Sequence, residues 1–168
     1  MRYYPAALAL SLLLGVSASM GSAKVSEPMD PRAQALLESG RTLLAQGRSI
    51  EATDAFEAAL AIDPGRIDTY LALAEAARRD GLQGKAIHYY RVALGQDPNN
   101  FAAIAGEGGA LVEKGAMEKA RRNLTRLEGL CGKRCGETRE LAAAIAKGPT
   151  APVISAEAVV PEPKVEDN

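Results

Sequence analysis

A spacing of 34 residues recurs through the middle of this 168-residue chain. The stretch "GRSIEATDAFEAALAIDPGR" begins at Gly47, and "GLQGKAIHYYRVALGQDPNN" begins at Gly81. Gly, Ala, a large aromatic residue, Ala-Leu and Asp-Pro stand at matching places in both, and a weaker third copy begins at Gly115. A fixed period of this length is typical of stacked supersecondary units, so the chain is expected to fold as a repeat array.

The repeated positions carry mostly small residues, which indicates helices that pack closely. Hydrophobic residues make up 47% of the chain but aromatic residues only 4%, so alanine and leucine supply most of the apolar mass. In each unit a glycine ends the first helix, small residues in both helices permit close approach, and a large side chain fills the space between them. The framework residues are Gly40, Gly47, Ala52, Phe56, Ala59 and Pro64; Ala74, Gly81, Ala86, Tyr90, Ala93 and Pro98; and Gly108, Gly115, Ala120 and Leu124.

This pattern resembles the tetratricopeptide repeat, a helix–turn–helix unit, over about residues 33–131. The resemblance implies an all-α, right-handed helical solenoid. Its domain would span residues 32–147, with units at about 33–66, 67–100 and 101–134 and a capping helix at about 137–147. The third unit departs from the pattern, because Cys131-Gly132 replaces Asp-Pro. Gly106, Gly108 and Gly109 in its first helix predict a locally loose helix, with a close contact or the backbone of a partner against Gly109.

Both ends of the chain are expected to lie outside this domain. Arg2, the apolar run from Ala6 to Val16 and the small residues Gly21-Ser22-Ala23 predict a signal peptide over residues 1–23, followed by a leader at 24–31. We therefore expect an exported protein of the bacterial periplasm, with an uncleaved membrane anchor as the alternative. Residues 148–168 hold four prolines and four acidic residues, which predicts a disordered tail.

The chain offers little for catalysis. Cys131 and Cys135 are the only cysteines, and in an exported protein a local disulfide is the preferred interpretation, with a reactive pair as the alternative. His88 is the only histidine and has no second ligand at helical spacing. The Asn123-Leu124-Thr125 glycosylation pattern falls on a packing position, so we attribute it to chance. We expect no catalytic residue, no cofactor and no metal.

The resemblance implies a concave groove, lined by the first helices, that binds segments of other proteins. The corresponding positions lack the basic residues with which some relatives hold a terminal carboxylate; only Arg41 is basic. Leu37 and Leu71 would be apolar anchors beside charged residues, which suits an amphipathic or acidic peptide, unless the charges serve only solubility. The predicted groove residues are Gln34, Leu37, Arg41, Asp68, Leu71, Glu75, Arg78, Arg79, Ala105, Gly109 and Glu113.

The leading functional hypothesis is a non-catalytic scaffold or adaptor of the cell envelope that binds a protein or peptide partner. The formal net charge of −1 gives no field for nucleic acid, and no small-molecule substrate is indicated. One alternative is a thiol–disulfide component that uses Cys131 and Cys135, and another is a self-assembling structural repeat. Since the groove charges are taken as surface residues, Arg78→Ala is expected to change stability by less than about 0.5 kcal/mol.

Overall fold

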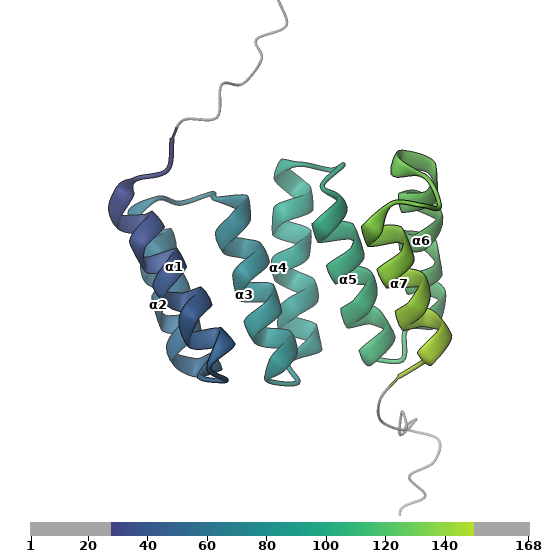
Figure 1. Ribbon diagram of the computed structural model, residues 1–168, viewed down its shortest axis with the longest axis horizontal. Helices are drawn as coiled ribbons and strands as arrows, with labels where there is room; N and C mark the ends of the chain where they lie inside the picture. Colours follow the sequence, from purple (N-terminus) through teal and green to yellow (C-terminus); the bar gives the residue numbers. More distant parts are fainter. Residues whose placement is uncertain (1–27, 150–168) are drawn as a thin grey trace, which may run out of the picture.

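The computed structural model describes residues 28–149, and these residues form an array of α-helices without strands (Figure 1). Helices α1 and α2, α3 and α4, and α5 and α6 form three successive pairs, and α7 packs against α5 and α6. The all-α solenoid of tetratricopeptide-like units is therefore confirmed. The helices are α1 (Pro31–Ala45), α2 (Ser49–Ile62), α3 (Ile67–Arg79), α4 (Gln83–Gln96), α5 (Phe101–Glu113), α6 (Met117–Cys131) and α7 (Gly136–Lys147).

Local sequence signals set where these helices begin and end. The Asp30 carboxylate accepts a hydrogen bond of 2.8 Å from the Arg32 amide, and Pro31 opens α1. The Asn100 side chain caps α5 by accepting from the Ala103 amide at 3.0 Å. The first helix of each unit ends before a glycine with positive φ, a conformation that other residues rarely adopt. These glycines are Gly47, Gly81 and Gly115, with φ of 78°, 72° and 80°.

Within a pair, the two helices approach closely because small residues face large ones. Ala52, Ala86 and Ala120 are completely buried in the second helices. In the first unit Phe56 lies directly over Gly40, where an added Cβ would come within 2.4 Å of the Phe56 Cε1 atom. The aromatic side chain therefore occupies the space that the glycine leaves free.

Helix α5 differs from the prediction of a locally loose helix. Its glycines each receive a large side chain from another helix: Tyr90 of α4 lies over Gly106, Leu141 of α7 over Gly108, and the Arg78 guanidinium of α3 over Gly109. Helices α3, α4, α6 and α7 all contact α5, and most of its residues are buried. The glycines thus make α5 the most enclosed helix among those described, which replaces our expectation of looseness.

Leu124 also departs from its predicted role. It is only half-buried, and the side chain that fills the space at Gly108 comes from α7 instead. Leu73, Glu107 and Leu141 follow the 34-residue period, and α7 contacts α5 and α6 just as α5 contacts α3 and α4. Helix α7 therefore occupies the place of the first helix of a fourth unit.

The predicted signal peptide, the first half of the leader and nearly all of the acidic tail lie outside residues 28–149. Within that range, no helix combines the length and the apolar character that crossing a membrane requires.

Candidate peptide-binding face

The first helices α1, α3 and α5 succeed one another along the array and carry the predicted groove residues (Figure 1). We call the surface that these residues occupy the first-helix face. Four of the predicted residues, Gln34, Arg41, Asp68 and Arg79, are exposed there. Leu71, Glu75, Arg78 and Glu113 are half-buried, while Leu37, Ala105 and Gly109 are buried.

The buried members require a correction, because they are core residues instead of contact residues. Leu37 is only 3% exposed and belongs to the apolar cluster that joins the first two units, together with Leu44 and Phe56. Ala105 packs in the cluster at the other end of the array, with Leu127 and Leu141. Leu37 therefore serves to join helices, and it is not available as an exposed apolar anchor.

Arg78 is the centre of a polar network that links the second and third units. Its Nη2 atom donates to Glu113 Oε1 at 2.5 Å, its Nε atom donates to Glu113 Oε2 at 3.3 Å, and its Nη1 atom lies 3.5 Å from Glu75 Oε2. Only about a quarter of the side-chain surface of Arg78 and of Glu113 is exposed. A two-point contact of this kind fixes the geometry of both partners, so it orients α3 against α5.

Burial and charge act in opposite directions on this network. Burial alone would lower the pKa of the Arg78 guanidinium, but the hydrogen bonds to Glu113 and the neighbouring Tyr90 hydroxyl outweigh it, so the pKa lies above its usual value. Burial raises the pKa of the Tyr90 hydroxyl, and the Arg78 charge opposes that rise. At neutral pH, Arg78 is therefore charged and Tyr90 is neutral.

The other two cations of the face also have partners. Arg79 donates from Nη1 to the Leu44 carbonyl in the last turn of α1, at 2.7 Å, and from Nε to Glu75 at 3.1 Å. Arg41 lies 2.6 Å from Glu38 on the same helix. About half of each arginine side chain remains exposed. The face is therefore a mixed-charge surface on a fixed scaffold, and not a bare basic patch.

A second polar network lies on the opposite side of α5 and was not predicted. The Glu107 carboxylate is nearly buried and accepts from Arg91 Nε at 2.7 Å and from Asn123 Nδ2 at 3.0 Å. Asn123 Nδ2 also lies 3.2 Å from the Ile104 carbonyl, so this amide points into the protein. The only signal for this network in the sequence is Glu107 itself, which stands at the repeat position that leucine occupies elsewhere, at Leu73 and Leu141.

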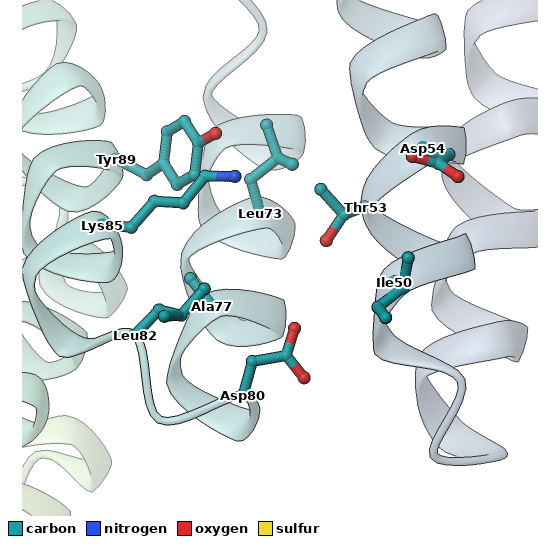
Figure 2. Close-up of a pocket in the computed structure, with 9 residues that line it drawn as sticks. All are labelled: Ile50, Thr53, Asp54, Leu73, Ala77, Asp80, Leu82, Lys85 and Tyr89. Atoms are coloured by element: carbon teal, nitrogen blue, oxygen red, sulfur yellow. The ribbon is translucent and has the colours of Figure 1, made fainter.

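A pocket of about 190 Å³ lies between α2 and α4, with α3 as its floor (Figure 2). Figure 2 shows Ile50 and Asp54 on one side and Tyr89 and Lys85 on the other, with Leu73 between them. The pocket was not among the predicted sites, and it lies away from the first-helix face.

The predicted cysteine pair lies between α6 and α7. The Cα atoms of Cys131 and Cys135 are 5.7 Å apart, within the range that a disulfide requires. The Glu137 Oε2 atom lies 2.9 Å from the Cys135 sulfur, and the Thr138 hydroxyl lies 3.4 Å from the Cys131 sulfur.

The residues that the structure describes contain no group of three or more His, Cys, Asp and Glu side chains that could hold a metal ion. His88 is exposed, and its nearest ring is Tyr89, at 5.7 Å between centroids.

Comparison with known proteins supports the repeat assignment. A family model described as tetratricopeptide repeat matches residues 33–66. A search of curated protein sequences gave no match.

Solved tetratricopeptide repeat (TPR) domains share the fold. The Sgt2 TPR domain from Aspergillus fumigatus is 23% identical, covers 85% of this chain and 94% of that one, and gives a TM-score of 0.63. The first TPR of Spaghetti (RPAP3), bound to an HSP90 peptide, is 23% identical with coverage of 68% and 94% and a TM-score of 0.60. The Yersinia enterocolitica type III secretion chaperone SycD, bound to a peptide of the translocator YopD, is 20% identical with coverage of 68% and 86% and a TM-score of 0.59.

Proposed function

Because the chain is a tetratricopeptide repeat protein, we propose that it is a non-catalytic scaffold that binds a peptide segment of a protein partner across the first-helix face. Two proteins with the same fold, the first TPR of Spaghetti and SycD, bind peptides. The supporting observation in this chain is the row of exposed side chains on successive first helices, above a network that holds α3 and α5 in place.

The chemistry of the face favours an amphipathic segment with mixed charge. Arg41 and Arg79 keep about half of their side-chain surface exposed, so each can bind a carboxylate of the partner in addition to its internal partner. Asp68 is exposed and has no ion-pair partner within residues 28–149, so it can pair with a basic side chain. Leu71 and Ala102 add apolar surface between these charges.

We further propose that the protein acts in the bacterial cell envelope and that Cys131 and Cys135 form a structural disulfide. The signal-like segment over residues 1–23 supports export to an oxidising compartment. A carboxylate so close to Cys135 disfavours a thiolate, which argues against the alternative of a reactive redox pair. Thiol trapping of the exported protein tests this assignment, because a structural disulfide stays protected until the protein is denatured and reduced.

Site-specific photo-crosslinking in the native cells tests the binding face. A photoreactive residue at Ala102, which is exposed on α5, is expected to capture a defined partner band, whereas one at the exposed Lys119 of α6 is not. Adding Arg41→Glu and Asp68→Arg is expected to abolish the Ala102 crosslink, because both charged contacts are reversed while the buried network is left intact. Equal capture from Ala102 and Lys119, or capture unchanged by the double substitution, would contradict the proposal.

A further inference from the structure

On the side of the second helices, the array has two grooves that correspond by the 34-residue period, but different side chains line them. The first lies between α2 and α4 and the second between α4 and α6. In register, Thr53 of the first corresponds to Ile87, and Ala77 corresponds to Leu111. Ile87 and Leu111 are 7% and 4% exposed, so these larger side chains help to fill the second groove. The smaller residues leave the first groove open as the pocket of Figure 2.

The polar residues also close the second groove and leave the first one open. Leu73 and Tyr89 of the first groove correspond to Glu107 and Asn123, which bond to each other across the second groove. The second groove is thus closed by its own polar network. The first has an apolar floor with no such closure, because Leu73 and Tyr89 cannot form this bond.

The mouth of the first groove also exposes apolar side chains to solvent. Ile50 is 75% exposed and Leu82 is 50% exposed. Within residues 28–149 only one other large apolar residue, Leu130 on α6, is exposed to a comparable degree, at 40%. The exposed large apolar side chains therefore lie on two surfaces, the first groove and the outer face of α6.

These two surfaces differ in charge: the first groove has two carboxylates and one cation, Lys85, which pairs with Glu57, whereas the outer face of α6 around Leu130 carries arginines. Beside Ile50, the Asp54 carboxylate has no ion-pair or hydrogen-bond partner among the described residues, and Asp80 accepts a hydrogen bond from Ser49. On α6, Arg126 and Arg122 lie one and two helical turns before Leu130 and share its face. Arg122 has no partner within the described range, and Arg126 donates to the Pro98 carbonyl.

We propose that the first groove binds the outer face of α6 from a second copy of this chain. With α6 antiparallel to α2, Leu130 enters the mouth between Ile50 and Leu82. Arg126 then lies opposite Asp54, because each residue is one helical turn from the apolar contact. The groove and α6 belong to different units, so the contact is head-to-tail and leaves a free groove and a free α6 at the ends of every open assembly. The first-helix face is not used, and the proposal is independent of peptide binding there.

Sedimentation velocity of the full chain over a range of concentrations tests this association. A single helix in one groove makes a small interface, so we expect weak association that is visible only at high concentration. Leu130→Ser, Asp54→Arg and Arg126→Asp are each expected to weaken it about tenfold or more. Lys133→Asp, which makes the same charge change as Arg126→Asp in an exposed turn, is expected to have no effect.

An equimolar mixture of the Asp54→Arg and Arg126→Asp chains is the decisive sample. In either variant alone, two like charges face each other at the contact. In the mixture, each contact between the two different variants pairs opposite charges, so association is expected to return. Association through residues 1–27 cannot produce this pattern. Melting curves of Asp54→Arg and Leu130→Ser should match the wild type, since both sites are exposed. A monomer mass at all concentrations, wild-type association in the single variants, or a mixture that stays monomeric would overturn the proposal.

Discussion

Tyr90 of α4 lies over Gly106 of α5, where an added Cβ atom would come within 2.3 Å of the Tyr90 Cζ atom. The equivalent aromatic residue of the first unit, Phe56, covers Gly40 of its own unit. Tyr90 reaches the first helix of the next unit, so this contact joins the second unit to the third, and Tyr90 also clusters with Ala74 of its own unit. Phe56 likewise clusters with Leu73 and Ala76 of the second unit. The same position in the repeat therefore packs both within its own unit and against the next one.

Gly106→Ala is expected to lower the free energy of unfolding by about 1–3 kcal/mol, because the new methyl group meets the tyrosine ring. The loss should appear although alanine favours a helix over glycine by about 1 kcal/mol. Urea unfolding followed by circular dichroism measures the change. Gly95→Ala is the control, since a Cβ there meets nothing within 4 Å, and it is expected to be neutral or stabilising. A neutral Gly106→Ala would contradict the packing described.

The period of the sequence was sufficient to predict the helices and much of the core. Ala52, Ala86 and Ala120 are fully buried as their register predicts, because every unit needs the same small residue where its helices cross. The partners of the α5 glycines could not be predicted in this way. Tyr90, Leu141 and Arg78 reach α5 from a neighbouring unit or from α7, and the 34-residue period does not specify which side chain meets which glycine.

Arg78→Ala is expected to lower the free energy of unfolding by about 1–2 kcal/mol, which replaces the near-neutral effect expected from sequence. The substitution removes both hydrogen bonds to Glu113 and leaves this half-buried carboxylate unpaired. Arg41→Ala is the matched control, because Arg41 pairs only with Glu38 at the surface, and its effect should stay below about 0.5 kcal/mol. Denaturant titration distinguishes the two, and equal effects would show that the pair between units contributes nothing.

The candidate binding face was also predictable only in part, because some of its contacts form between units and not within one. Exposed residues such as Gln34 and Asp68 follow from their place on the first helices. The burial of Leu37 depends on α3 packing against α1, and the closure of Arg78 on Glu113 depends on how two units meet. Neither is visible in one unit of the repeat.

Stability is expected to fall at alkaline pH because Tyr90 ionises more readily in the unfolded chain. Burial raises the pKa of Tyr90 above the value of about 10 of an unfolded tyrosine. Well below pH 10 both states keep the proton, and the contribution of Tyr90 to stability is constant. As the pH rises through the unfolded and then the folded pKa, the unfolded state loses its proton first and stability decreases.

Urea midpoints at pH 8 and pH 11 measure this loss, and the Tyr90→Phe variant isolates it. The variant should show a smaller decrease between the two pH values, since the lysines that titrate in the same range are unchanged. A decrease identical to that of the wild type would mean that Tyr90 ionises equally in both states.

Loss of the proposed disulfide is expected to release α7 before the rest of the array unfolds. Replacing both cysteines by serine should lower the free energy of unfolding by about 2 kcal/mol, the contribution of a short closed loop in the chain-entropy model. Leu141 of α7 covers Gly108 and packs with Ile104 and Leu127, so detachment of α7 exposes the end of the core. Hydrogen exchange should therefore accelerate first in α7 and next in α5. A reductant should reproduce the effect in the wild type and change nothing in the serine variant, whereas equal exchange in all samples would show that packing alone holds α7.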